Sequence, residues 1–344
     1  MRLRWAVVAV VAAVLVRLPA VTTLPIDWDE PIYMDASSEA AAAMAAADWG
    51  ALSNPTLNRE HPPLVKMIYG ASMLPHGDEP TLVQRLASTR GVALTAGIGL
   101  VAMVAWVHPA AGVVLATHTI HAKYSSQAYL DSLPLLWMTT AMLLGWSARH
   151  RMGSGRGIAA AACWGAACAG KWIHGLPGLV LVAAVPGWSS RMRLLATALA
   201  CAFVMDPSSW FGPWGRLTEM VGLHVEYAAG LPAPSQWWQP WLHLGAGGPA
   251  RWHPEAFPAS LDGLWLVLAM VGLFLNRRDP WARFLAAWWA VPMLLFMAWD
   301  TRWPQHAMVV VVPVCLSAAL GLREIFSRAS RRFGPSATRP PASE

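Results

Sequence analysis

The chain has 344 residues, of which 56% are hydrophobic and only 13% are charged, and its formal net charge is +6. A soluble domain carries about 25% charged residues, so this chain lacks the polar surface that a water-soluble protein of its length needs. The composition therefore excludes a soluble globular enzyme, and the high apolar content also excludes an intrinsically disordered chain. Repeated long apolar runs instead predict an all-α polytopic membrane protein.

We expect about ten transmembrane helices and two loops that are longer than a simple connection needs. The apolar segments are residues 5–24, 86–107, 109–124, 130–148, 157–170, 172–188, 194–210, 261–276, 281–299 and 306–322. They predict a first transmembrane helix (1–24), a first exoplasmic loop with juxtamembrane helices (25–84), a transmembrane bundle (85–210), a second exoplasmic loop (211–260), C-terminal transmembrane helices (261–322) and a cytoplasmic basic tail (323–344).

Two of these segments have alternatives. Residues 157–188 fit one long span as well as two, because Lys171 and Pro177 lie in the middle of the stretch. Two spans are preferred, since they keep Arg191 and Arg193 on the same side as most other arginines. The first residues, Met1–Ala20, also have the basic start and short apolar run of a cleaved signal peptide, but a retained anchor fits the membrane-embedded chain that follows.

The positive charges indicate the orientation of the chain. With ten crossings and a cytoplasmic N-terminus, one side of the membrane receives 15 of the 25 Lys and Arg residues and 3 of the 19 acids. The positive-inside rule makes this side cytoplasmic and both long loops exoplasmic. The basic balance is thus a topology signal and does not indicate nucleic-acid binding. We expect an integral multi-pass protein of the plasma membrane.

The first long loop opens with a cluster of acids, Asp27, Asp29 and Glu30. Mutual repulsion and partial desolvation would raise the pKa of at least one of these carboxylates, which is what a general base near neutral pH requires. The alternative is a solvated loop start, in which Asp29 or Glu30 only stabilises the N-terminus of the following helix.

The same loop contains the stretch EHPPLVK, residues 60–66. Its proline pair fixes an extended entry into a helix that carries Lys66. The stretch either locks the carboxylate of Glu60 and the imidazole of His61 at the membrane surface, or it is an ordinary proline-started helix.

Three further ionisable residues lie in or near the membrane. Asp131 lies where a span meets the outer surface, and Lys171 lies inside or near the membrane. An ionisable group at such depth is costly, so Lys171 either binds a phosphate or is paired with Asp131 or snorkels to the interface. Arg302, in the stretch DTRWPQH that ends at His306, has a forked guanidinium that suits a phosphate, or is a simple outer-edge charge.

A metal site is only weakly indicated. His118 and His121 have an i, i+3 spacing and could bind a divalent metal together with Glu60 or His61. The four cysteines all fall in apolar segments without a CxxC motif, so we expect buried apolar side chains rather than disulfides or zinc ligands. No cofactor is firmly predicted.

Taken in order, these motifs resemble the protein O-mannosyltransferase family, polytopic GT-C glycosyltransferases that use a polyprenyl-phosphate sugar. The resemblance covers residues 1 to about 322. It rests on Asp29-Glu30, His61-Pro62-Pro63-Leu64 with Lys66, Leu130-Asp131, Gly170-Lys171-Trp172 with Gly175, Ser235 with Trp237 and Trp238, and Arg302 with His306. The large soluble domain of the eukaryotic members has no room in the second exoplasmic loop.

The resemblance implies a role for each of these residues. Asp29 would be the catalytic carboxylate that deprotonates the acceptor hydroxyl, and Glu30 would support it or position the acceptor. The remaining site residues divide into Glu60, His61, Lys66 and Asp131, which would position the acceptor and the loop, and Lys171, Arg302 and His306, which would bind the donor phosphate. A lipid phosphate is already a good leaving group, so stabilising its charge is the remaining task.

The resemblance also implies the partners: a polyprenyl-phosphate-linked sugar, with mannose favoured, a protein Ser or Thr hydroxyl as acceptor, and membrane lipid. Related aminoarabinose and mannose transferases have a similar Asp-Glu pair and modify lipid or polysaccharide, so such an acceptor is the alternative. A transporter of lipid-linked sugar is disfavoured, because the acids concentrate in the outer loops and no internal repeat is evident. A non-catalytic scaffold predicts that Asp29→Ala and Lys171→Ala leave function intact.

Overall fold

The computed structural model describes residues 2–230, 236–299 and 302–333, and all regular structure in these ranges is helical. The all-α prediction is therefore confirmed for this part of the chain. The helices are α1 (Arg2–Thr23), α2 (Glu30–Ala45), α3 (Trp49–Ser53), α4 (Leu64–Met73), η1 (Leu74–His76), α5 (Leu82–Val107), α6 (Pro109–Thr117), α7 (Thr119–Tyr124), α8 (Ser132–Ala148), α9 (Gly155–Gly170), η2 (Trp172–Gly175), α10 (Gly178–Ala184), α11 (Trp188–Met205), η3 (Pro207–Ser209), α12 (Pro213–Ala229), α13 (Gln239–Gly245), α14 (Gly248–Trp252), α15 (Asp262–Leu275), α16 (Pro280–Ala298), η4 (Pro304–Ala307) and α17 (Met308–Phe333).

Four helical stretches are long and apolar enough to cross a membrane, namely Leu3–Thr23, Leu82–Val107, Pro280–Ala298 and Pro304–Ser330. They make the chain a multi-pass membrane protein by length and composition. A straight crossing of the hydrocarbon core needs about 20 residues. Helices α8, α9 and α15 have 17, 16 and 14 residues and fall short of that length. The expectation of ten spans is thus confirmed only in part.

The expected single span over 109–124 is wrong, because the segment forms two short helices that meet at His118. The backbone of His118 is extended, with φ −73° and ψ 116°. The carboxylate of Asp262 accepts a hydrogen bond from the backbone N of Thr119 at 3.0 Å and a second bond from the Thr119 hydroxyl. This distant acid therefore stabilises the start of α7 and keeps it separate from α6.

The alternative of one long helix over 157–188 is also wrong. Helix α9 ends at Gly170, and Lys171 adopts an extended backbone with φ −160° and ψ 107° before the short η2 turn and α10 follow. The expected two segments are therefore found, although their second part is a 3-10 turn and a seven-residue helix.

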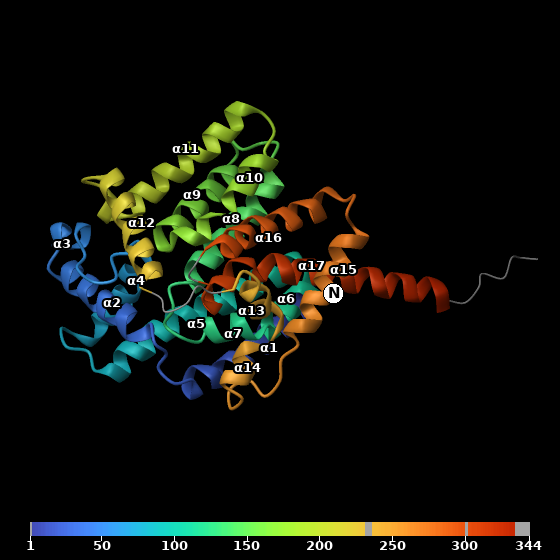
Figure 1. Cartoon of the computed structure of the whole chain (residues 1–344), viewed down its shortest axis with the longest axis horizontal. Coiled ribbons are helices and arrows are strands. Elements are labelled where there is room, and N and C mark those ends of the chain that lie inside the picture. Colours follow the sequence, from blue (N-terminus) through green and yellow to red (C-terminus); the bar gives the residue numbers. More distant parts are fainter. Residues whose placement is uncertain (1, 231–235, 300–301, 334–344) are drawn as a thin grey trace, which may run out of the picture.

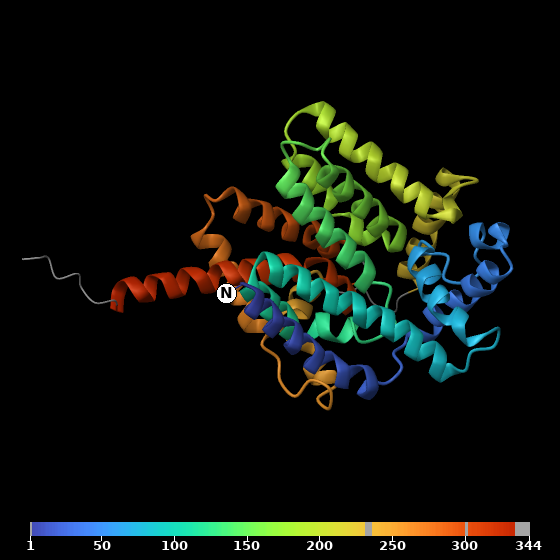
Figure 2. The same ribbon diagram turned by 180° about the vertical axis from the view of Figure 1, so that it is seen from behind.

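The helices form an elongated bundle with the first loop at one end (Figures 1 and 2). Helices α2, α3 and α4 lie at that end, and α17 extends beyond the bundle at the other end. Within the bundle α15 packs on α17, where Cβ atoms on Gly272 and Gly321 would lie 2.1 Å and 2.3 Å from backbone oxygens of the facing helix. Only glycine permits this close approach of two helices, which is a common way of packing in membranes.

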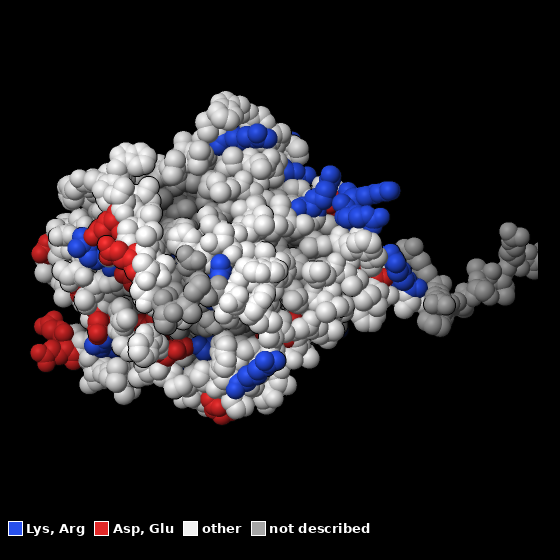
Figure 3. Space-filling view, in the orientation of Figure 1, with Lys and Arg blue, Asp and Glu red and all other residues white. Residues whose placement is uncertain are grey.

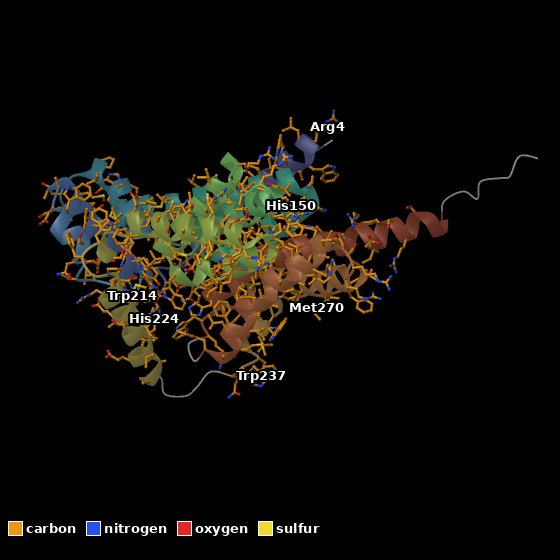
Figure 4. The ribbon with its side chains drawn as sticks, turned by 90° about the horizontal axis from the view of Figure 1, so that it is seen from above. Arg4, His150, Trp214, His224, Trp237 and Met270 are labelled. Carbon is orange, nitrogen blue, oxygen red and sulfur yellow. The ribbon has the colours of Figure 1, made fainter. Side chains whose placement is uncertain are left out.

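The charges are segregated along the long axis. Acidic side chains gather over the end that carries α2 and α3, whereas Lys and Arg gather near the turn between α15 and α16 and on α17 (Figure 3). Figure 4 likewise separates Arg4 and His150 from Trp214 and His224 along this axis. This is the distribution that the positive-inside rule describes for a chain whose first loop faces outwards.

Candidate active site

A buried segment of residues 118–131, here called the strap, provides the inner wall of the site. It consists of His118, α7 and the irregular residues 125–131, and every residue in it is buried. The strap lies between α1, α5 and α17 (Figure 1). Its side chains and backbone contact the acids of the first loop, so it connects the helical bundle to this loop.

Arg17 of α1 fixes the strap from within the bundle. Its side chain is fully buried and donates hydrogen bonds to the Ser125 hydroxyl and to the Ala116 carbonyl, both at 2.9 Å. A further bond of 2.5 Å reaches Nδ1 of His121. His118 lies with Nδ1 3.5 Å from a carboxylate oxygen of Asp262. These two histidines are therefore engaged inside the bundle with Arg17 and Asp262. Glu60 instead bonds Asn58, and the ring of His61 packs on those of Tyr33 and His224.

Glu30 is fully buried and both its oxygens are engaged. Arg90 of α5 donates to Oε1 at 2.9 Å and to Oε2 at 2.7 Å. The backbone N of Ala128 in the strap donates to Oε1 at 2.6 Å, and the backbone N of Asp27 donates to Oε2 at 2.9 Å. A buried carboxylate that already accepts four hydrogen bonds has little capacity to accept a further bond, or a proton, from a substrate. The geometry fits the supporting role for Glu30 that the resemblance allowed.

Asp27 is paired with Lys123, which the strap contributes. Burial alone would raise the pKa of Asp27, but the charge and the hydrogen bond of Lys123 hold that pKa below its ordinary value. The Lys123 ammonium also lies over the ring of Tyr124, 4.3 Å from its centroid. Asp27 is thus an anionic partner of the strap rather than a base.

Asp131 and Lys171 form a buried ion pair. Lys171 Nζ lies 3.0 Å and 2.9 Å from the two carboxylate oxygens, and His174 Nε2 lies 2.8 Å from one of them. Both side chains of the pair are at most 2% exposed. The sequence left three alternatives for Lys171: binding a phosphate, pairing with Asp131, or snorkelling to the interface. In the structure Lys171 is paired with Asp131. The break between α9 and η2 allows this contact, because it turns Lys171 away from a regular helix.

Asp29 has a different environment from the other three acids. It is half-buried, and its Oδ2 accepts only two long hydrogen bonds, from the Tyr33 hydroxyl at 3.4 Å and from Gln305 Nε2 at 3.2 Å. Within residues 2–230, 236–299 and 302–333, no Lys or Arg forms an ion pair with it, whereas Asp27, Glu30 and Asp131 each have one.

Burial raises the pKa of Asp29. The positive charge of Lys171 opposes this effect, and repulsion from Asp131 and Asp27 adds to it. A partly accessible carboxylate with a raised pKa and only neutral donors is suited to accept a proton.

The stretch 60–66 folds around its own polar groups. Glu60 accepts a hydrogen bond of 2.5 Å from Asn58, and Lys66 donates to the carbonyls of Asn58 and His61 at 2.8 Å and 3.0 Å. Burial lowers the pKa of Lys66 to about 7. The ring of His61 packs 6.2 Å from that of Tyr33, the residue that contacts Asp29. The structure thus brings the EHPPLVK stretch next to the acid cluster through the contact of His61 with Tyr33.

Arg302 and His306 lie in the turn that precedes α17. Arg302 donates to the carbonyls of Phe296 and Met297 at 2.8 Å and 2.7 Å, and the ring of His306 stacks on that of Phe296 at 5.6 Å. The residue that reaches Asp29 from this turn is Gln305, which the sequence analysis did not select. Ser235, Asp300, Thr301 and the second half of the basic tail, residues 334–344, lie outside the described residues.

In the described part of the chain, no group of three or more His, Cys, Asp or Glu side chains could hold a metal ion. The site has one partly accessible carboxylate, Asp29, beside three carboxylates that are ion-paired. It lies at the end of the bundle that carries the first long loop (Figure 1).

No family model and no curated protein matches this sequence. Two solved structures of ArnT from Cupriavidus metallidurans share its fold. The apo structure is 18% identical with a TM-score of 0.63, and the match covers 95% of this chain and 61% of that chain. The structure bound to undecaprenyl phosphate is 17% identical with a TM-score of 0.64, and the match covers 95% of this chain and 62% of that chain.

The chain therefore has an ArnT-like fold. It spans about three fifths of the length of the ArnT chains that it matches. Since identities of 17% and 18% establish the fold alone, the chemistry has to be argued from the site.

Proposed function

We propose that this protein is an outward-facing glycosyltransferase that transfers a sugar from a polyprenyl-phosphate donor to an acceptor hydroxyl. The observation that carries the proposal is the environment of Asp29. Of four neighbouring acids it is the half-buried one that has no ion-pair partner among the described residues. The ArnT-like fold supports the donor class, because the matched ArnT was solved with undecaprenyl phosphate bound. The four long apolar helices support a site at the membrane surface.

In the proposed reaction Asp29 accepts the proton of the acceptor hydroxyl as its oxygen attacks the anomeric carbon of the sugar. A new C–O bond forms, the bond between that carbon and the phosphate oxygen breaks, and the electron pair leaves with the polyprenyl phosphate. Gln305 and Tyr33 orient the Asp29 carboxylate. Lys171 acts through its field on Asp29, and Arg302 is proposed to bring positive charge to the leaving phosphate.

Mannose and a protein Ser or Thr hydroxyl remain our proposed sugar and acceptor, following the resemblance of the motifs. A lipid or polysaccharide hydroxyl, the acceptor of the related transferases named with the resemblance, is the second candidate. We also propose that the shorter apolar helices complete a bundle of about ten spans, with Glu60, His61 and Lys66 forming the acceptor side of the site and His306 supporting the turn that carries Arg302.

The test is transfer of radiolabelled sugar from polyprenyl-phosphate mannose, and then from other polyprenyl-phosphate sugars, in membranes that contain the wild type or Asp29→Asn. We expect transfer by the wild type and a loss of at least about 10²-fold in the variant at equal membrane level. The control is Asp35→Asn, the same change in an exposed acid that pairs with Arg85.

Label in the protein or in the lipid extract identifies the acceptor class. Full activity of Asp29→Asn would remove Asp29 from the role of base. Failure of the wild type with every polyprenyl-phosphate sugar would contradict the proposed function.

A further inference from the structure

Helix α12 in the second exoplasmic loop has an apolar face that no other part of the described chain covers. Its large exposed side chains recur every three or four residues, which places them on one face of the helix. They are Trp214, 78% exposed, Leu217, 47%, Val221, 50%, and Val225, 59%. Arg216 and Met220 on the opposite face are both 8% exposed. The helix therefore lies on the protein with one face and presents an apolar stripe with the other.

The buried face of α12 contacts the EHPPLVK stretch. Arg216 donates from Nη2 to the carbonyl of His61 at 3.3 Å, and the ring of His224 lies 5.6 Å from that of His61. Glu219 is ion-paired with Arg59, which immediately precedes this stretch. Since His61 in turn packs on Tyr33 beside Asp29, α12 forms the outer wall of the site.

The apolar stripe continues the surface of α11, the apolar helix that precedes α12. On α11 the exposed side chains include Leu199, 61%, and Val204, 66%, and the connecting turn adds Phe211, 86% exposed. Helix α11 runs obliquely to the long axis of the molecule (Figure 1), whereas α12 runs across it (Figure 4). An amphipathic helix that crosses the axis of the bundle at its outer end has the orientation of an interfacial helix.

We propose that α12 lies in the plane of the outer leaflet, with Trp214, Leu217, Val221 and Val225 in lipid, and that this contact presses His61 against the active site. The bilayer is thus the partner of the stripe. Large apolar side chains exposed at this density are unfavourable in water and stable at the boundary of the acyl chains. Tryptophan at the first turn suits this depth, because its ring prefers the interface.

The placement is tested with nitroxide labels on the full chain in nanodiscs of phosphatidylcholine and phosphatidylglycerol. Cys163, Cys168, Cys201 and Cys315 are first replaced by alanine or serine, and one cysteine is then introduced at 217, 221 or 225. The matched control is Glu226→Cys, since one residue turns the label by about 100° around the helix, towards water. Broadening by oxygen reports lipid, and broadening by a water-soluble nickel chelate reports water.

We expect oxygen access at positions 217, 221 and 225 and nickel access at 226. Equal nickel access at all four positions would overturn the proposal. Protection from both reagents would also overturn it, because a second copy of the chain or another protein would then cover the stripe. These outcomes do not require the protein to be active.

The effect on the site, which rests on the proposed function, is tested with Val221→Glu and Val225→Glu beside Glu226→Val. A charge on the lipid face lifts α12 from the bilayer and displaces His61, so we expect transfer to fall at least about tenfold in both variants. Glu226→Val is expected to transfer like the wild type. Unchanged transfer by the two Glu variants would disprove the link to the site, and an inactive wild type would instead contradict the proposed function.

Discussion

Gln305 donates a hydrogen bond of 3.2 Å to Oδ2 of Asp29, although 276 residues separate the two in sequence. Gln305 lies in η4, directly before α17, and Asp29 lies directly before α2. The first exoplasmic loop is therefore joined to the last apolar helix at the proposed base. A neutral amide donor orients the carboxylate and leaves its negative charge in place. A lysine or arginine at this position would neutralise that charge.

Gln305→Leu removes this donor, and we expect kcat to fall about tenfold, because a hydrogen bond to a charged group contributes about 1.5 kcal/mol. The measurement is sugar transfer under saturating donor. Gln236→Leu, at an exposed position of the second loop, is the control and should transfer at the wild-type rate. A Gln305→Leu variant with wild-type kcat would exclude any part of this amide in orienting Asp29.

The transfer rate should depend on the protonation of Asp29. Its pKa is raised above the ordinary value of 3.8, and only the deprotonated carboxylate can act as a base. Activity should therefore be lost as the pH falls through this raised pKa and should rise towards neutral pH. The measurement is kcat/KM against pH. In the Gln305→Leu variant the Asp29 carboxylate loses a hydrogen-bond donor that favours its charged form, so the fall of kcat/KM on the acid side should move to higher pH. Coincident acid limbs in the two proteins would argue against Asp29 as the titrating group.

Glu30→Gln should chiefly destabilise the protein. The change leaves Arg90 without its buried carboxylate partner, which typically costs about 3–5 kcal/mol. We expect a lower thermal unfolding midpoint in detergent and a lower membrane level. Asp35→Asn breaks the exposed pair with Arg85 and should change the midpoint little. Equal midpoints for the wild type and Glu30→Gln would contradict the clamping role of this pair.

Lys171→Met should be more harmful to folding than Lys171→Met combined with Asp131→Asn. The single change leaves a buried carboxylate uncompensated, and the double change removes both charges. We expect the double variant to regain most of the membrane level but not the transfer activity, since the ion pair that fixes the end of the strap near Asp29 is absent. Recovery of transfer in the double variant would show that the Asp131–Lys171 pair has no part in the reaction beyond folding.

Arg17→Gln should misplace the strap. Its guanidinium holds the Ala116 carbonyl and Ser125, so its loss leaves buried acceptors unpaired and frees the segment that carries Lys123 and Asp131. We expect kcat to fall at least about tenfold, with little change in the Kd for polyprenyl phosphate. Arg4→Gln, an exposed change on the same helix, should leave both quantities unchanged. Parallel losses of binding and rate would indicate general unfolding instead of misplacement.

Much of the architecture follows from the sequence. The apolar runs predict the helical class. The acids at 27–30 indicate a place where carboxylates at a membrane boundary need partners, and there the structure has the pairs of Glu30 with Arg90 and of Asp27 with Lys123. The break at His118 could not be predicted, since it depends on the contact of Thr119 with Asp262, 143 positions further along the chain. The pairing of Lys171 with Asp131 was one of several alternatives, because spacing along the chain does not fix which helices become neighbours.

Two residues that the sequence analysis did not select, Arg17 and Arg90, do carry a signal in the sequence. Arg17 and Arg90 each lie within an otherwise apolar segment, and an arginine at membrane depth is costly unless it has a partner. They would have directed attention to the strap and to Glu30. Gln305 and His224 carry no such signal, because a polar residue in an outer loop is ordinary.

The joining of Asp29 to Gln305 has a consequence for synthesis of the protein. When α5 has entered the membrane, the first loop can already be held by Arg90, and the strap follows soon after. Asp29 acquires its last hydrogen-bond donor only when residue 305 has emerged and α17 has inserted. In a growing chain Asp27 and Glu30 thus gain their partners early. Asp29 gains its Gln305 donor late, after nearly all of the helices have reached the bilayer.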